Sequence, residues 1–203
     1  MKRIELTFNF RGSRNYLHGT DIYPAILNTV EQEVGGAISG PVSISFKGFS
    51  DTQFDLILFE DADTFSKPEA SVVYFDVAIN NKHVQGWLVQ SSRPVIDRTP
   101  FDEDAICVNM ALGSDSLMNT SKFDLPAIDV LIPMTKFMHQ SLLPAENSRW
   151  ILSKLELDRP LTETDIAGLR INLIQNLGNR LTKSLVTSYD KPIGHIYFSW
   201  IAS

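Results

Sequence analysis

The segment covering residues 11–36, RGSRNYLHGTDIYPAILNTVEQEVGG, predicts one amphipathic helix that is entered through a polar loop. Apolar residues recur at helical spacing in this segment, namely Ile22, Ile26, Leu27, Val30 and Val34. Thr20 or Asp21 can cap the helix, and Pro24 is expected in its first turn. A Gly-Gly pair ends it. Because the rest of the first half reads as strands, we expect that half to fold around this helix.

Alternation of apolar and polar residues predicts strands on both sides of the helix. Residues 4–10 alternate before it, and four further strands are predicted after it, at residues 42–46, 54–58, 71–79 and 84–90. Asn80-Asn81-Lys82 has the composition of a turn. One helix against one antiparallel sheet is an α+β layer, which we predict for residues 1–98.

Beyond this first module the pattern weakens. We predict a less regular connection over residues 99–124, in which residues 105–112 fit either a short helix or a strand. A second, less regular module is predicted over residues 125–203. Ile128, Val130 and Ile132 alternate and predict a strand that Pro133 ends. A short helix over residues 136–143 and strands over residues 150–157 and 193–201 are expected to follow.

Residues 163–177 allow two structures. Thr162 to Asp165 resembles a capping box, and apolar residues follow at helical spacing as far as Leu177. Leu169, Ile171 and Leu173 also alternate, and residues 176–179 resemble a hairpin turn. We favour a strand over roughly residues 168–175 and keep the helix as the alternative.

Two segments in the two halves resemble each other. They are YFDVAINNKHVQGWLVQSSRPV at residues 74–95 and INLIQNLGNRLTKSLVTSYDKPI at residues 171–193. Both predict a strand, a turn with Asn, a second strand, and a polar step that ends in a basic residue, Pro and an aliphatic residue. Either two unrelated hairpins share this pattern, or the chain repeats one module of roughly 100 residues.

The composition excludes several classes of function. A net charge of −6 argues against a nucleic-acid binder that relies on bulk phosphate attraction. Cys107 is the only cysteine, so an intrachain disulfide and a Cys-based zinc site are excluded, and a cytoplasmic location is expected. The alternation of IELTFNF predicts a strand near the N-terminus rather than a signal peptide, and no window resembles a membrane span.

Motifs for common cofactors are missing. The sequence has neither a phosphate-binding Gly loop nor a Gly-x-Ser-x-Gly elbow. His83, His139 and His195 are scattered, without the spacing of a metal site. We therefore expect no metal and no cofactor, and we expect Cys107 to be a buried residue rather than a nucleophile.

The stretch NYLHGTDIYPAIL resembles the His-Gly entry into the central helix of hotdog-fold thioesterases and dehydratases, and NLGNRLTKSLVTS resembles the end of tandem double-hotdog acyl-CoA thioesterases. This resemblance implies a long central helix wrapped by an antiparallel sheet, in one module or in two fused modules. The sequence departs from the family at three points. It has His-Gly-Thr in place of His-Gly-Gly, it lacks the His-Phe-Pro-Gly run of dehydratases, and it has Thr187 where the double-hotdog enzymes carry Gln.

The resemblance implies an acid/base site at the start of the helix. His18 would act as a base or would orient the thioester carbonyl, with Asp21 or Glu31 as its acidic partner. The structural alternatives are a loop histidine at residue 18, a helix cap at Asp21 and a solvated side chain at Glu31.

The polar loop before the helix would bind the substrate. The residues expected to do so are Arg11, Arg14, Asn15, Tyr16 and Gly19. The two arginines would hold a phosphate of coenzyme A or of a phosphopantetheine arm, or they are ordinary surface residues.

The expected function follows from this resemblance. The chain would bind acyl-CoA or an acyl carrier protein and act as a dehydratase, a hydratase or a thioesterase. The alternatives are a non-catalytic hotdog-like binding or assembly module without an acid/base pair, and an unrelated α+β interaction domain. Single hotdog modules dimerise along a sheet edge, so we expect a homodimer or a fused pair that acts as a pseudo-dimer.

Overall fold

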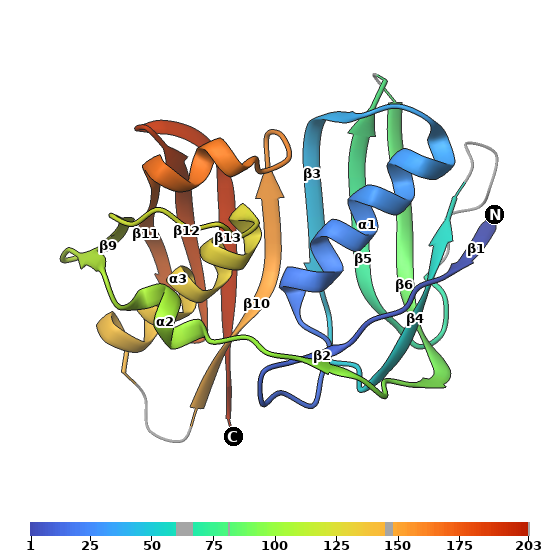
Figure 1. The fold of residues 1–203 in the computed structure, drawn as a ribbon, viewed down its shortest axis with the longest axis horizontal. Helices are drawn as coiled ribbons and strands as arrows, with labels where there is room; N and C mark the ends of the chain where they lie inside the picture. Colours follow the sequence, from blue (N-terminus) through green and yellow to red (C-terminus); the bar gives the residue numbers. More distant parts are fainter. Residues whose placement is uncertain (60–66, 81, 145–147, 203) are drawn as a thin grey trace. The chain divides into compact units, whose positions relative to one another are not determined.

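The computed structural model describes residues 1–59, 67–80, 82–144 and 148–202. The chain divides into two compact units, unit 1 (Met1–Phe101) and unit 2 (Asp102–Ser203). Each unit contains an antiparallel sheet and a helix of 16 residues that is followed by four long strands (Figure 1).

The sheet of unit 1 has the order β1-β4-β6-β5-β3, and every neighbouring pair is antiparallel. Its strands are β1 (Lys2–Glu5), β3 (Ile38–Phe46), β4 (Thr52–Leu58), β5 (Ser71–Ile79) and β6 (Lys82–Pro94). Two short strands, β2 (Phe10–Arg11) and β7 (Arg98–Thr99), form a separate parallel pair. The four strands predicted after the helix are confirmed, whereas the one predicted over residues 4–10 is interrupted between β1 and β2. Asn80 has a positive φ of 51°, as a turn residue can, and Asn81 lies outside the described residues.

Helix α1 (Gly19–Val34) lies across the sheet of unit 1, as Figure 1 shows. Its stripe of Ile22, Ile26 and Val30 is buried, and so is the sheet core, which includes Ile44, Leu56, Phe75 and Leu88. Burial of this stripe is what holds a 16-residue helix in place, because isolated helices of that length are marginal in water. The helix is of ordinary length, not the long helix expected, because Gly35 turns the chain away with a φ of 76°.

The start of α1 differs from the prediction. The N-cap is His18, whose Nδ1 accepts a hydrogen bond from the backbone N–H of Thr20 at 3.4 Å. Neither Thr20 nor Asp21 is the cap, because both already lie inside the helix. Pro24 consequently falls in the second turn and not the first.

Unit 2 has a sheet with the order β10-β13-β12-β11-β9-β8. Its elements are α2 (Glu103–Cys107), β8 (Met110–Leu112), β9 (Ser116–Asn119), α3 (Ala127–Leu142), β10 (Ser148–Leu157), the 3₁₀ helix η1 (Glu163–Gly168), β11 (Leu169–Leu177), β12 (Leu181–Ser188) and β13 (Lys191–Ala202). The stretch predicted as an irregular connection thus contains α2, β8 and β9. Within residues 105–112 the chain forms the end of a helix and then a strand, where the sequence allowed either one.

The strand predicted at residues 128–132 is wrong, because this segment belongs to α3 and Pro133 lies inside that helix. The residues between the alternating aliphatic ones, Asp129 and Leu131, are buried as well. A helix that is buried on nearly all sides loses its amphipathic period. The alternation of Ile128, Val130 and Ile132 therefore does not distinguish a strand from a buried helix.

The strand favoured near residues 168–175 is confirmed as β11, and the capping box ahead of it starts η1 rather than a long helix. In that box the Thr162 N–H donates to the Asp165 carboxylate at 2.8 Å. The predicted hairpin turn is also present, because Gly178 and Asn179 both have positive φ and the Arg180 N–H donates to the Leu177 oxygen.

The two similar sequence segments do not occupy equivalent places. Residues 74–95 cover β5 and β6, the last two of the four strands after α1, whereas residues 171–193 cover β11 and β12, the second and third of the four after α3. The sheets also differ in order, β3-β5-β6-β4 in unit 1 against β10-β13-β12-β11 in unit 2. The similarity is therefore that of two ordinary hairpins, not of a repeat in register.

Candidate functional site

The loop before α1 is held in shape by Arg98 of β7. Its Nη1 donates to the backbone oxygens of Gly12 and Arg14 at 2.6 Å each, and its Nη2 donates to Asn15 Oδ1 at 3.0 Å. Gly12 has a φ of 55°, and a Cβ there would lie 2.8 Å from the backbone oxygen of Phe101. The loop can therefore pack against residues 98–101 only with glycine at this position.

Where the loop meets the helix, four polar side chains form one network. His18 is buried, with 7% of its surface exposed, and its Nδ1 lies 2.7 Å from Thr20 Oγ1. Arg11 Nη1 donates to the same Thr20 oxygen at 3.1 Å. Arg11 Nε also pairs with the Asp21 carboxylate at 2.8 Å. The network thus links three of the predicted site residues, with His18 joined to Arg11 through Thr20 and Asp21 joined to Arg11 directly.

This network bears on the tautomer of the His18 ring. Thr20 Oγ1 accepts from Arg11 Nη1, and its own proton is free to be donated to His18 Nδ1. Nδ1 also accepts from the backbone of Thr20 as the N-cap. Because Nδ1 accepts the N-cap hydrogen bond, we assign the tautomer with the proton on Nε2.

Aromatic rings flank the network and the loop. The Arg11 guanidinium lies 4.5 Å from the ring centroid of Phe101, and the His18 ring lies 6.3 Å from it. Farther along the loop, Tyr16 contacts Phe49 at 4.7 Å and the Arg14 guanidinium at 5.8 Å. Arg11 and Gly19 are thus at the helix start with His18, whereas Arg14, Asn15 and Tyr16 make their described contacts within the loop and with Phe49 and Arg98.

Glu31 is not brought to this site. Its Oε1 accepts a hydrogen bond from the backbone N–H of Ile38 at 2.8 Å, beyond the C-terminal end of α1. Thirteen residues of helix separate it from His18, which corresponds to about 20 Å along the axis. The structure therefore leaves Asp21 as the predicted carboxylate that lies near His18.

His139 is the most buried histidine of unit 2, with 1% of its surface exposed. Its Nδ1 donates to the Thr135 oxygen, its Nε2 lies 2.5 Å from Thr182 Oγ1, and its ring stacks on Phe198. Burial lowers the pKa of His139 to about 4, although the bond to Thr135 acts in the opposite direction. It is a neutral core residue at pH 7.

Other candidate chemistry is not supported by the described part of the chain. Cys107 is buried in α2, and burial together with Glu103 and Asp104 raises the pKa of its thiol to about 12, so it is a poor nucleophile at neutral pH. Among the described residues, no group of three or more His, Cys, Asp or Glu side chains could hold a metal ion. In the same residues no helix combines the length and the apolar character that crossing a bilayer requires.

The fold has counterparts among solved structures. The chain is similar to the tesB protein of Mycobacterium avium subsp. paratuberculosis, with a TM-score of 0.52 and 9% sequence identity over 99% of this chain and 92% of that one. Weaker similarity links it to the dehydratase domain from the CurJ module of curacin polyketide synthase (TM-score 0.49, 11% identity, 98% of this chain and 86% of that one). The 12:0-ACP thioesterase from Umbellularia californica is similar at a TM-score of 0.46 (10% identity, 100% of this chain and 94% of that one). No protein-family model matches the sequence, and no curated protein matches it.

Proposed function

From the hotdog fold of this chain, we propose that unit 1 binds an acyl thioester at the start of α1 and that His18 polarises its carbonyl group. The observation that carries the proposal is the network from Arg11 through Thr20 to His18, which holds the His18 ring in place at the start of α1. The substrate class is an acyl group on coenzyme A or on an acyl carrier protein.

The geometry supports charge stabilisation rather than proton abstraction by His18. Hydrolysis and the hydration or dehydration of an acyl thioester both develop negative charge on the carbonyl oxygen. In this proposal the Nε2–H of His18 is a donor of the kind that stabilises such charge, and the N-terminal end of the α1 dipole acts in the same direction. Asp21 pairs with Arg11 and so supports the network. His18 is therefore a carbonyl-orienting residue in this proposal and not the base.

Replacing His18 tests the proposal. We expect His18→Ala to lower kcat/KM on acyl-CoA by about 100-fold, as the loss of one preorganised donor does. Thr20→Val keeps the shape but removes the hydroxyl that contacts His18 Nδ1, and we expect a loss of about tenfold. Free thiol release measures hydrolysis, and the loss of enoyl absorbance measures hydration.

His83→Ala is the matched control, since His83 is exposed on β6 and pairs with Asp76. It should leave both activities unchanged. The N-cap contribution of His18 to stability is about 1 kcal/mol, so thermal unfolding of His18→Ala must show a folded protein. Equal turnover by wild type and a folded His18→Ala would remove His18 from the mechanism.

A non-catalytic binding or assembly module is the second candidate. It is favoured by the engagement of both predicted carboxylates, Asp21 with Arg11 and Glu31 with the backbone of Ile38. In that case wild type binds acyl-CoA without turning it over, and calorimetry with a non-hydrolysable thioether analogue separates binding from catalysis. Turnover by wild type in either assay would exclude this alternative.

We further propose that the two units are two fused modules, so that one chain is equivalent to a dimer of single modules. The helix followed by four strands in each unit supports this. Sedimentation equilibrium should then give the monomer mass of 22.8 kDa. A stable dimer would contradict the fused pair and favour a homodimer.

A further inference from the structure

The sheet of unit 2 ends in a strand with an open edge. Strand β8 is the last in the strand order and, among the described strands, pairs with β9 alone. The Gly113 N–H donates to the Ser116 oxygen at 2.8 Å, and this bond closes the hairpin between β8 and β9. Because bonded and non-bonded pairs alternate along an antiparallel ladder, Ala111 is the residue of β8 that bonds to β9. The backbone N–H and C=O groups of Met110 and Leu112 therefore point away from β9, and no hydrogen bond to them occurs within the described ranges.

Strand β8 lacks the features that normally protect an open edge. Its three residues, Met110, Ala111 and Leu112, include no charge and no proline, and its ladder with β9 runs without a register shift. Proteins usually place such features on edge strands, because unpaired backbone groups readily accept a strand from another chain. The edge strand of unit 1, β1, carries three charged residues in four. The edge at β8 is thus open where the edge at β1 is guarded.

Apolar side chains are exposed beside this edge. Leu112 in β8 and Met118 in β9 are 46% and 43% exposed, and Val108 just before β8 is 73% exposed. Met118 pairs with Ala111, whereas Leu112 pairs with Leu117, so the two exposed strand residues lie on opposite faces of the hairpin. An added strand would therefore find an apolar contact on each face.

The segment that contains this edge is acidic. Residues 102–124 hold five acidic residues and one basic residue, a net charge of −4, against −6 for the whole chain. Glu103 is paired with Lys136. Asp104, Asp115 and Asp124 are exposed and form no ion pair with the part of the chain that the structure describes. Most of the net negative charge of the protein is therefore carried by the segment around β8.

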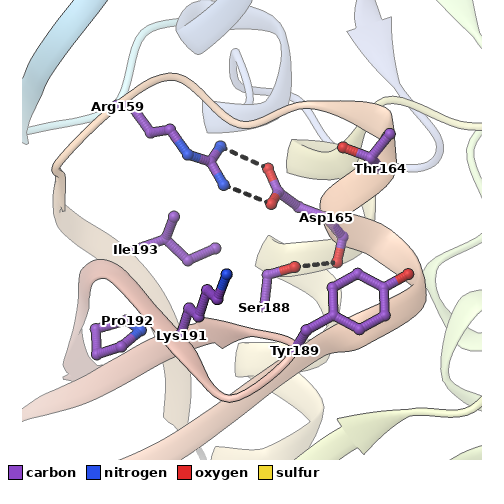
Figure 2. Close-up of a pocket in the computed structure, with 8 residues that line it drawn as sticks. All are labelled: Arg159, Thr164, Asp165, Ser188, Tyr189, Lys191, Pro192 and Ile193. Atoms are coloured by element: carbon purple, nitrogen blue, oxygen red, sulfur yellow. Dashed lines mark hydrogen bonds and ion pairs between the residues drawn. The ribbon is translucent and has the colours of Figure 1, made fainter.

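The carboxylate in the pocket of unit 2 differs in this respect. This pocket, of about 440 Å³, lies beside η1, and Figure 2 shows Asp165 facing Arg159 there, with two hydrogen bonds of 2.8 and 2.7 Å between them. Burial acts to raise the pKa of Asp165, but the bonds from Arg159 and Thr162 outweigh it and lower the pKa to about 2. The charge that could attract a basic partner is therefore found along residues 102–124 and not in this pocket.

We propose that the open edge of β8 binds a basic, extended segment of a partner protein, which adds a strand to the sheet of unit 2. The backbone of this segment pairs with the N–H and C=O groups of Met110 and Leu112. Its apolar side chains pack beside Leu112 and Met118, and its lysine or arginine side chains are attracted by the negative charge of residues 102–124. A second copy of this chain is disfavoured as the partner, because pairing at β8 would bring two acidic segments together.

A seven-residue peptide of alternating lysine and valine with blocked ends, titrated into the full chain, tests this site. Hydrogen exchange of the backbone amides, followed by NMR, is the readout. We expect the amides of Met110 and Leu112 to gain protection that saturates with peptide, because their N–H groups become bonded. Ala111 already bonds to β9 and should change least. Failure of the peptide to bind, or binding that leaves Met110 and Leu112 unprotected, would overturn the proposal.

Replacing Leu112 tests the contribution of the backbone. Leu112→Pro removes one outward N–H group without removing a hydrogen bond of the folded chain, and proline is tolerated on the open side of an edge strand. We expect this variant to bind the peptide about fivefold more weakly, with thermal unfolding showing that it is folded. A folded variant that binds the peptide as tightly as wild type would overturn pairing at this edge.

Replacing acidic residues tests the contribution of charge. Asp104→Asn combined with Asp115→Asn should weaken binding by about fivefold at low ionic strength. Asp190→Asn is the matched control, since it removes one charge from the exposed turn between β12 and β13, and asparagine tolerates the φ of 61° found there. It should leave the affinity unchanged.

The identity of the partner is tested separately. A peptide of alternating glutamate and valine should not bind, and its binding as tightly as the lysine peptide would overturn the assignment to a basic segment. Dimerisation of the chain without peptide, with the amides of Met110 and Leu112 protected in the dimer, would assign the edge to a second copy and overturn the basic partner.

Discussion

Lowering the pH from 7 to 4 reduces the free energy of unfolding by about 3 kcal/mol through His139 alone. In the folded chain the pKa of His139 is lowered to about 4, while in the unfolded chain the imidazole titrates near 6.5. Between these values the unfolded state takes up a proton that the folded state does not. The stabilisation from this residue is therefore complete above pH 6.5 and is lost as the pH falls toward 4.

Comparison with His139→Phe isolates this effect from the titration of carboxylates. Phenylalanine preserves the stacking on Phe198 and the packing on Trp150 but cannot titrate. At pH 7 the variant is expected to be less stable than wild type by about 1 kcal/mol, because its hydrogen bonds are lost. Between pH 7 and pH 4 its free energy of unfolding should fall by less than that of wild type. Urea unfolding of wild type and variant at pH 7 and pH 4 measures how much of the loss in unfolding free energy comes from His139. A titration midpoint of His139 near 6.5 in NMR spectra of the native protein would contradict the prediction.

Gly194→Ala is expected to destabilise the chain by at least about 3 kcal/mol, from backbone strain and overpacking together. Gly194 has a φ of 144°, and a Cβ there would lie 2.1 Å from the backbone oxygen of Glu156 and 2.6 Å from the Cα of Leu157. It belongs to β13, which is paired on one side with β10 and on the other with β12. Because both neighbours are hydrogen-bonded strands, β13 cannot move aside without breaking a ladder.

Gly178→Ala is the matched control for this substitution. Gly178 also has a positive φ, of 58°, but no atom lies within 4 Å of the position that its Cβ would occupy. Only the conformational cost remains, which we expect to be about 1 kcal/mol. Urea unfolding should therefore separate the two variants clearly. Equal destabilisation by both would show that the close approach to β10 is relieved by local movement.

The fold was predictable from the sequence where one side of an element is buried and the other is not. In β5 buried and half-buried residues alternate along the whole strand, and the apolar stripe of α1 is equally regular. The same reasoning failed for α3, which is buried on nearly all sides. The order of strands in each sheet could not be predicted from such patterns, because strand pairing depends on tertiary contacts that alternation does not encode.

The candidate site was predictable only where the chain itself brings residues together. Arg11, His18 and Asp21 meet because they flank one helix start, and Thr20 was expected there as a cap rather than as the link between them. Arg98 and Phe101 lie about 80 residues later, and no motif marks them. The open edge of unit 2, strand β8, lies within residues 105–112, for which the sequence allowed a helix or a strand, so this edge could not be predicted.

The different strand orders of the two units have a consequence for the time course of folding. In unit 2, β8 pairs with β9, β11 with β12 and β12 with β13, so much of its sheet forms by closing short loops. In the described part of unit 1 only β5 and β6 form such a hairpin, while β3 pairs with β5 and β4 with β6 across an intervening strand.

Pairing between distant segments is slow because the entropy of a long loop is lost before the contacts form. We therefore expect the amides of β11, β12 and β13 to gain protection from hydrogen exchange before those of β3 and β4 when the full chain refolds. Pulse labelling during refolding measures this order, and earlier protection of β3 would contradict it. The half of the chain that carries the His18 network would then be the last to become functional.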